Sequence, residues 1–99
     1  MKIIAIEREL PGITEEHLQP YLKEESARAW ELYQSGIVRE LHFRVDRPGA
    51  LLVLEAASVE EAKKTLATLP LVREGLIEFD LIPLAPYPGF ARLFARKEN

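Results

Sequence analysis

The sequence lacks several residues and segments that identify common classes of protein. Its 99 residues include no cysteine, which excludes disulfide bonds and thiolate metal ligands and favours a cytoplasmic location. No run approaches the roughly 20 apolar residues of a membrane span, and the N-terminal KIIAIERE becomes charged too early for a signal peptide. We therefore expect a cytoplasmic protein with no membrane partner.

An excess of charge of one sign is also lacking. Thirteen basic residues are mixed with sixteen acidic ones, for a net charge of −3, so no nucleic-acid partner is predicted. The two histidines, His17 and His42, lie too far apart for a metal-binding spacing, and no glycine-rich phosphate loop is present. The sequence therefore predicts neither a metal nor a cofactor.

The hydrophobic content is that of an ordinary globular protein. It amounts to 47% of the residues, so we expect one folded domain over residues 1–99. A chain this short leaves roughly a third of its unfolded surface exposed after folding. A partner subunit that completes the core would therefore be an advantage.

Residues 37–57 predict a β-hairpin at the centre of the fold. In the connecting DRPG, Pro48 and Gly49 suit the two middle positions of a type II turn. The run over residues 50–54 is apolar on both faces, which is typical of a strand that water reaches on neither side. The preceding run alternates, with Ile37, Arg39, Leu41, Phe43 and Val45 on one face and Val38, Glu40, His42 and Arg44 on the other.

The first third of the chain predicts a strand and a helix. Residues 2–8 form an apolar run of strand length. Thr14 is a suitable N-cap, but Pro20 removes a backbone hydrogen bond, so the helix breaks there after a short turn or begins at Pro20 itself. Gly36 is well placed to end it. The apolar stripe of this helix comprises Leu18, Leu22, Ala29, Trp30 and Tyr33, and we expect Trp30 and Tyr33 to be core or helix-packing residues.

The second half predicts another helix and another strand. Ser58 and Glu61 have the spacing of a capping box, in which each side chain satisfies a backbone N–H of the other residue. The helix ends at Leu69-Pro70, and residues 71–75 form a connection. Residues 76–84 then alternate, with Ile77, Phe79 and Leu81 on one face and Leu76, Glu78, Asp80 and Ile82 on the other.

The element order β-α-β-β-α-β predicts an α+β, ferredoxin-like fold with an antiparallel four-stranded sheet in the order 4-1-3-2. Both crossovers are right-handed, so the two helices cover the same face. The other face is centred on isoleucine, leucine and valine, and monomers rarely expose an apolar patch of that size. We therefore expect a second copy to cover it, sheet against sheet, as a dimeric α/β barrel.

Residues 84–99, which we call the C-terminal arm, are rich in proline and apolar side chains. Its large apolar residues are Tyr87, Phe90, Leu93 and Phe94, and its prolines favour an extended path. We expect the arm to pack against a neighbouring subunit and so support a higher oligomer. The alternative is that it folds back over its own helices.

Three stretches together resemble a known family. They are LYQSGIVRELHFRV over residues 32–45, VLEAASVEEAKKTLATLPL over 53–71 and IEFDLIPLAPYP over 77–88. With their Leu-Pro-Leu and Pro-Leu-x-x-x-Pro patterns, they are similar to the muconolactone isomerase-like group of dimeric α/β-barrel proteins. The second strand is one residue longer than is usual in that group. The resemblance implies a small cytoplasmic protein that forms sheet-to-sheet dimers, and the enzyme after which the group is named moves a double bond in a lactone carboxylate without cofactor or metal.

His42 is the strongest candidate for chemistry. A two-residue hairpin loop would place it directly opposite Glu55, and a four-residue loop would place Glu55 on the diagonal, so both share one face. An imidazole held by a carboxylate can act as acid or base near neutral pH. Glu78 and Asp80 lie on the matching face of the opposite edge strand, where dimerisation would bring them to the same cavity. Arg44 is placed to hold a substrate carboxylate by bidentate pairing.

Two functions follow from these candidates. The first is a cofactor-free isomerase or related acid–base enzyme that acts on a small unsaturated lactone or organic acid. The second is a non-catalytic module that binds a small ligand or serves assembly. Under the second, His42 is a structural histidine, and Glu78 and Asp80 are solvated or form salt bridges between subunits.

Overall fold

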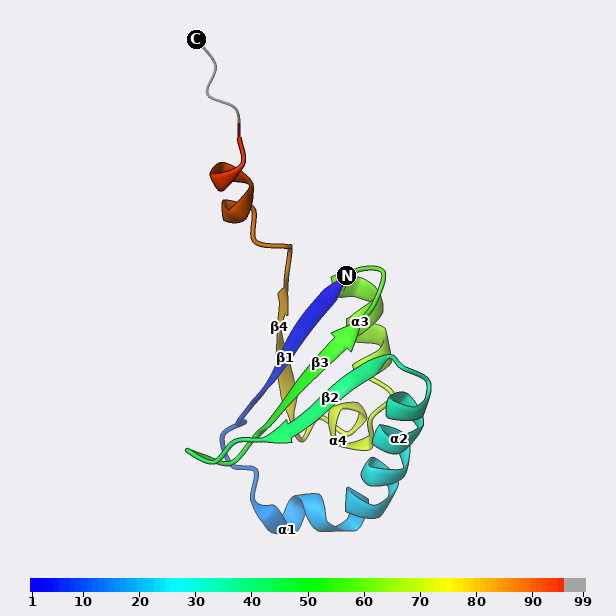
Figure 1. The fold of residues 1–99 in the computed structure, drawn as a ribbon. Coiled ribbons are helices and arrows are strands. Elements are labelled where there is room, and N and C mark those ends of the chain that lie inside the picture. The colour runs from blue at the N-terminus through cyan, green and yellow to red at the C-terminus, as the bar shows by residue number, and fades with distance from the viewer. Residues whose placement is uncertain (96–99) are drawn as a thin grey trace.

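The computed structural model describes residues 1–95, which form a sheet, helices packed against it and a projecting arm (Figure 1). Every helix within these residues is too short or too polar to cross a lipid bilayer. In chain order, with η marking a 3-10 helix, the elements are β1 Lys2–Arg8, α1 Glu15–Leu18, η1 Gln19–Tyr21, α2 Leu22–Gln34, β2 Val38–Phe43, β3 Ala50–Glu55, α3 Val59–Leu66, α4 Pro70–Arg73, β4 Glu78–Pro83 and η2 Gly89–Leu93.

The four strands form one antiparallel sheet in the order β2-β3-β1-β4. This is the predicted order read from the other edge, so the α+β, ferredoxin-like fold is confirmed. The two strands whose sequences are apolar on both faces, β1 and β3, are central, whereas the half-polar β2 and β4 are the edges. A run whose polarity does not alternate is typical of a strand whose two faces are both shielded from water.

One face of the sheet packs against the helices. Ile3 pairs with Leu54 and Ala5 with Leu52 across β1 and β3, and all four side chains are buried. The buried core cluster consists of Ile3, Ala5, Leu32, Val38, Leu52, Leu54, Ala62, Leu66 and Leu69. Because α2 and α3 both contribute to this single cluster, both helices lie on the same face, as predicted.

The opposite face, which we call the open face, is covered by no helix of residues 1–95 (Figure 1). In the strand registers, its centre is formed by the apolar side chains Ile4, Ile6, Leu51, Val53 and Ile82. Polar pairs surround this centre: Arg8 with Glu78 at one edge, Glu40 with His42 at the other, and Glu55 with the N-terminal ammonium group. An apolar centre with a polar rim is the usual anatomy of a protein interface.

The helix after β1 breaks at Pro20, which agrees with the first of the two predicted starts. A short α1 follows the N-cap Thr14, residues 19–21 form the 3-10 helix η1, and α2 begins at Leu22. A proline inside a regular helix removes one backbone hydrogen bond, so the tighter turn relieves the conflict. Gly36 follows the C-cap with φ +82°, a conformation that glycine adopts without steric cost.

A β-bulge in β2 corrects the predicted alternation of that strand. The register shifts between Val38 and Glu40, so that Val38 pairs with Leu54 on the helix-covered face and is 1% exposed. Val38 was expected on the polar face, and that expectation is wrong. A bulge accommodates one extra residue in one strand, which agrees with the unusual length of this strand.

The hairpin loop is longer than a tight turn. The strand pairs end at Phe43 and Ala50, and the amide of Arg44 donates to the carbonyl of Gly49 over 2.9 Å. Residues 44–49 therefore all belong to the loop, and Gly49 has φ +145° where β3 begins. The predicted two-residue and four-residue loops are both wrong, which changes the register of every pair in the hairpin.

Two details after β3 also differ from the prediction. Ser58 is the N-cap of α3, and its hydroxyl accepts a hydrogen bond from the amide of Glu61 over 3.2 Å, which is one half of the predicted capping box. Residues 70–73, expected to be part of a connection, form the single-turn helix α4. Pro70 stands at its first position, where a missing N–H costs nothing.

The C-terminal arm leaves β4 and extends away from the rest of the chain (Figure 1). The alternative in which it folds back over its own helices is therefore wrong for residues 84–95. A 3-10 helix at residues 89–93 interrupts the expected extended path. Arg96 to Asn99, the last part of the predicted arm, lie outside the described residues.

Glu25 connects α2 to α4. Its carboxylate accepts a hydrogen bond from the amide of Leu71 over 2.9 Å, in the first turn of α4. Burial raises the pKa of the Glu25 carboxyl above its ordinary value of 4.5, although the hydrogen bond from Leu71 opposes the shift. The Glu25 carboxyl therefore binds a proton more readily in the folded state than in the unfolded chain.

We predict that Glu25→Gln flattens the pH dependence of stability. Because the pKa is raised on folding, the contribution of Glu25 to stability is greatest when it is protonated and is lost as pH rises above about 4.5 through the folded pKa. Glutamine keeps the acceptor for Leu71 without a charge, whereas Glu25→Ala leaves the amide unpaired and costs about 1–3 kcal/mol. Urea unfolding between pH 4 and 8 measures both effects, and parallel curves for Glu25→Gln and the parent protein would contradict the prediction.

Candidate functional site

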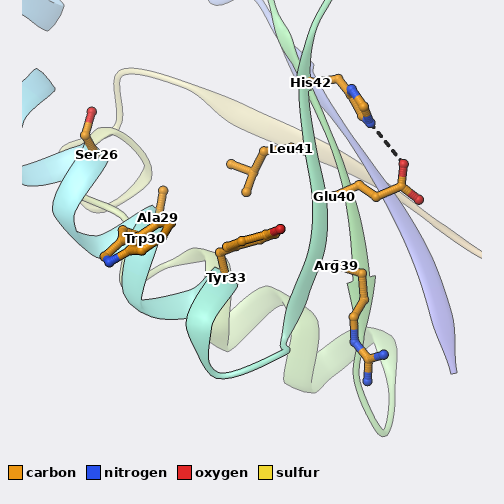
Figure 2. A pocket seen from close by; sticks show the side chains of 8 residues that line it. All are labelled: Ser26, Ala29, Trp30, Tyr33, Arg39, Glu40, Leu41 and His42. Carbon is orange, nitrogen blue, oxygen red and sulfur yellow. Dashed lines mark hydrogen bonds and ion pairs between the residues drawn. The ribbon is translucent and has the colours of Figure 1, made fainter.

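A groove of about 560 Å³ lies between α2 and the edge strand β2 (Figure 2). Ligand pockets commonly have volumes of about 300–1,000 Å³, so a small organic molecule would fit. The groove is lined from α2 by Ser26, Ala29, Trp30 and Tyr33, and from β2 by Arg39, Glu40, Leu41 and His42.

The helix side of the groove is aromatic. Trp30 and Tyr33 stack with ring centroids 5.8 Å apart, and Figure 2 shows Leu41 of β2 between these rings and the strand. Trp30 is 58% exposed and Tyr33 48%, so of the two expected roles, core or helix packing, the core role is wrong. Leu32 occupies the core position instead. Because a helix turns by about 100° per residue, the side chains at 30 and 33 point past the edge of the sheet.

His42 projects from the opposite side of β2. Its Nε2 lies 3.0 Å from a carboxylate oxygen of Glu40, two residues earlier in the same strand. Side chains two residues apart on a strand share a face, which brings the pair together without any distant part of the chain. Figure 2 shows both side chains pointing away from the aromatic wall, on the other side of β2.

The expected pairing of His42 with Glu55 is wrong. His42 pairs with Leu51 in the sheet, because residues 44–49 form a longer loop than predicted. Glu55 lies on the same face but four residues further along β3, which corresponds to about 13 Å. Its carboxylate instead lies 3.2 Å from the N-terminal ammonium group of Met1.

Glu78 and Asp80 lie on the open face, like His42, but at the other edge of the sheet. The register sets them beside β1, where Arg8 pairs with Glu78 and its Nε lies 3.6 Å from Asp80. Three strand spacings separate β2 from β4, about 14 Å. Within one protomer these carboxylates and His42 are therefore not brought together.

Arg44 lies in the hairpin loop and is already engaged. Its guanidinium makes two hydrogen bonds to the carboxylate of Asp46, at 2.9 and 2.6 Å. These bonds raise the pKa of Arg44 and lower the pKa of Asp46. Arg44 therefore shows the bidentate geometry that suits a carboxylate, but its present partner is Asp46 rather than a substrate.

The sequence reasoning missed three residues of the groove. Glu40 is the carboxylate that holds His42, and its position two residues before His42 was the available signal. Trp30 and Tyr33 form the aromatic wall, but periodicity could not separate a side chain that faces the core from one that faces past a sheet edge. Together an imidazole, a carboxylate and an apolar wall suit proton transfer on a small molecule.

The described residues contain no group of three or more histidine, aspartate, glutamate or cysteine residues that could hold a metal ion. The acidic residues on the open face are distributed over both edges and one end of the sheet, each beside a cationic partner or His42. The acidic side chains of this face therefore form separate pairs rather than one cluster of negative charge.

We predict that Arg44→Gln raises the pKa of the Asp46 carboxyl towards its ordinary value of 3.8. The two hydrogen bonds from Arg44 are the main cause of the lowered pKa, and glutamine supplies no charge to replace them. An NMR titration of the aspartate carboxyl carbon measures the change. Arg39→Gln serves as the control, because Arg39 donates to the carbonyl of Gly36 and not to Asp46. An unchanged titration of Asp46 in Arg44→Gln would show that the pair does not form in solution.

Comparisons with known proteins agree with the fold. A crystal structure of muconolactone isomerase superposes with a TM-score of 0.72 and 22% sequence identity, covering 89% of this chain and 92% of that one. A 5-chloro-2-hydroxyhydroquinone dehydrochlorinase from Burkholderia phenoliruptrix AC1100, in complex with 2,5-dihydroxybenzoquinone, superposes with a TM-score of 0.63 and 17% identity, covering 86% and 94%. A search of curated proteins finds no match.

The family comparison covers most of the chain. The sequence profile of muconolactone delta-isomerase matches residues 4–89, which include most of β1, all of β2, β3 and β4, and the groove between α2 and β2. The similarity to the two solved structures agrees with this assignment at the level of the fold. The chain belongs to the muconolactone delta-isomerase family.

Proposed function

We propose that the protein is a cofactor-independent acid–base enzyme that isomerises a small unsaturated lactone or a related organic acid. The observation that carries the proposal is the His42–Glu40 pair on β2, the strand that lines one side of a groove with an aromatic wall. The groove is large enough for one such molecule, and its apolar side suits a ring or a conjugated chain. Membership of the family supports the reaction class.

The proposed reaction is a proton transfer with no net change in composition. The imidazole of His42 removes a proton from a carbon near the carbonyl of the substrate, and the electrons move into the conjugated system. The same imidazole then returns the proton to another carbon of that system, which moves the double bond. Glu40 holds the ring and stabilises its charged form between the two steps.

A substrate carboxylate needs a cationic partner. Arg44 is the proposed group, and binding would exchange its present partner Asp46 for the carboxylate of the substrate. Arg39 lines the groove itself and is the nearer alternative. Both named relatives carry names that refer to small oxygenated ring compounds, which supports this class of ligand.

We further propose that two protomers associate through their open faces. The apolar centre of that face and its charged rim support a sheet-to-sheet homodimer. Glu78 and Asp80 of one protomer would then lie nearer to His42 of the other, where they could serve as further acid–base groups. Glu55 would contribute to the rim. We retain the cytoplasm as the proposed location.

His42→Gln should lower the rate of isomerisation by about 100-fold to 10,000-fold, the usual contribution of a general acid or base. Glu40→Gln should lower the rate less, because the imidazole remains but loses its charged partner. Turnover of a panel of unsaturated lactones and keto acids, followed by the change in ultraviolet absorption, measures both. His17→Gln is the matched control, since His17 bonds to Thr14 at the start of α1, away from the groove.

Two outcomes would contradict the catalytic proposal. Full activity in His42→Gln would show that another group moves the proton. If the parent protein turns over no member of the panel but calorimetry detects binding of a lactone, the second candidate, a non-catalytic ligand-binding module, is correct.

Ile4→Lys should weaken the sheet-to-sheet contact and lower the mass of the assembly. Ile4 pairs with Val53 and Ile82 at the centre of the open face, and a buried lysine without a partner would disfavour the contact. Sedimentation equilibrium gives the mass, and circular dichroism checks the fold. Val45→Lys is the control, because Val45 is fully exposed in the hairpin loop. If the association state of Ile4→Lys equals that of the parent, the open face is not the interface.

A further inference from the structure

The free edge of β2 is bordered by exposed apolar side chains. Phe43 is 80% exposed and Leu41 42%, and Trp30 and Tyr33 of α2 are exposed beside the same edge. β2 pairs only with β3, so its other side has no neighbouring strand within residues 1–95 (Figure 1). An apolar strand edge of this kind is a surface on which another strand can pair.

The hairpin register identifies the backbone groups that face this edge. The amide of Arg44 donates to the carbonyl of Gly49, so Arg44 and Gly49 form a hydrogen-bonded pair of the ladder. Such pairs alternate with non-hydrogen-bonded pairs in an antiparallel ladder. Leu41 and Phe43 therefore belong to non-hydrogen-bonded pairs with β3, and their N–H and C=O groups point away from β3. These are the groups that a further strand would bind.

We propose that β2 of one copy pairs with β2 of a second copy, antiparallel and centred on His42, so that two sheets join edge to edge. In this register Leu41 lies opposite Phe43 of the second copy, and the two residues exchange backbone hydrogen bonds. The twofold symmetry repeats this exchange on the other side of the axis. The contact uses the edge of β2 and not the centre of the open face, so it is distinct from the proposed sheet-to-sheet dimer.

The sequence of the edge is complementary to itself in this register. Residues 40–44 read ELHFR, and an antiparallel second copy sets Glu40 opposite Arg44 and Leu41 opposite Phe43. Opposite charges and apolar side chains that face each other across antiparallel strands stabilise the pairing, whereas like charges destabilise it. Each of these favourable pairs occurs on both sides of the symmetry axis. Charge complementarity therefore identifies a second copy of this chain as the occupant of the edge.

The neighbouring registers satisfy the edge less well. With the symmetry axis at Phe43, Glu40 faces Asp46 of the second copy, which sets two carboxylates opposite each other. With the axis at Leu41, Phe43 faces Arg39 of the second copy, which lies in the β-bulge outside the regular ladder. The proposed register avoids both faults.

On the helix side of β2, the second copy would cover part of the groove. Figure 2 shows Leu41 on this side, and Phe43, two residues further along the strand, shares it. Phe43 of the second copy, opposite Leu41, would therefore lie beside the stacked rings of Trp30 and Tyr33. This contact removes the most exposed side chain of β2 from water.

On the open-face side of β2, the second copy would add a cation to the His42–Glu40 pair. The carboxylate of Glu40 lies 3.0 Å from Nε2 of His42, and Arg44 of the second copy would approach it across the strands. Arg44 bonds to Asp46 through Nε and Nη2, which leaves Nη1 for a second carboxylate. The effect of this cation on the reaction rests on the proposed function, whereas the strand contact itself does not.

The other edge of the sheet, at β4, does not suit such a pairing. The amide of Leu84 donates to the carbonyl of Lys2, and the same alternation directs the backbone groups of Leu81 and Pro83 outward. Pro83 has no N–H to donate. Pairing of β4 with itself about Asp80 would set two Asp80 carboxylates opposite each other. These features are typical of an edge that is protected from pairing.

Charge reversal tests the pairing in full-length chains. Glu40→Arg sets two arginines opposite each other and Arg44→Glu sets two glutamates opposite each other, so each variant alone should associate about tenfold more weakly than the parent. An equimolar mixture restores opposite charges across the strands and should recover the parent mass in sedimentation equilibrium. The double variant Glu40→Arg/Arg44→Glu should recover it alone. Circular dichroism checks the fold of each chain.

Glu60→Arg and Lys64→Glu are the matched controls. They make the same changes of charge at exposed positions of α3, away from the edge of β2. Neither variant, alone or mixed with the other, should change the mass of the assembly.

Hydrogen exchange separates this contact from the sheet-to-sheet dimer. The amides of Leu41 and Phe43 should become protected as the protein concentration rises, and Glu40→Arg should lower that protection about tenfold at equal concentration. The amide of His42 points towards β3 and should stay protected in both chains. Ile4→Lys should keep the protection of Leu41 and Phe43, because it changes the open face and not the edge.

Two results would overturn the proposal. One is a mixture of Glu40→Arg and Arg44→Glu that is no heavier than either variant alone. The other is unprotected exchange of the Leu41 and Phe43 amides at a concentration where the parent is associated. Neither measurement depends on turnover, so a parent that isomerises no lactone but shows both effects would remove the proposed function and leave the edge contact in place.

Discussion

Burial of a single face of the sheet is the constraint on which the rest of the structure depends. Ile3, Ala5, Leu52 and Leu54 pack against the helices, and these contacts form the buried core cluster of residues 1–95. The same central strands carry apolar side chains on their other face, for which residues 1–95 supply no helix. The proposed association follows from this uncovered apolar face.

The edge strand β2 connects this architecture to the proposed chemistry. Because β2 is an edge strand, it pairs with only one neighbouring strand. Helix α2 packs beside it, and the groove lies between the helix and the strand. Residues of β2 alternate between the groove wall, where Leu41 meets the aromatic rings, and the open face, where His42 meets Glu40. One strand thus supplies both the apolar surface and the acid–base pair.

The groove and the open face adjoin at β2, which links assembly to the site. The proposed sheet-to-sheet dimer would cover the His42 side of the strand and remove water from the His42–Glu40 pair. Exclusion of water strengthens the pairing of an imidazole with a carboxylate, because the local dielectric falls.

Local features of the sequence were sufficient for the fold. The doubly apolar runs at residues 2–8 and 50–54 predicted the central strands, and alternation at residues 76–84 predicted an edge strand, because these patterns reflect how many sides of a strand are covered. Pro20 and Gly36 marked a break and an end of the helix through their own backbone geometry. The order of elements then left few possible topologies.

Only the tertiary structure decided which side chains meet. The partner of His42 depended on a loop length and on a bulge at residues 38–40, and a shift of register moves every pair in a hairpin. The exposure of Trp30 depended on how α2 is rotated against the edge of the sheet. Each is a property of several segments together, so no local pattern in the sequence contains it.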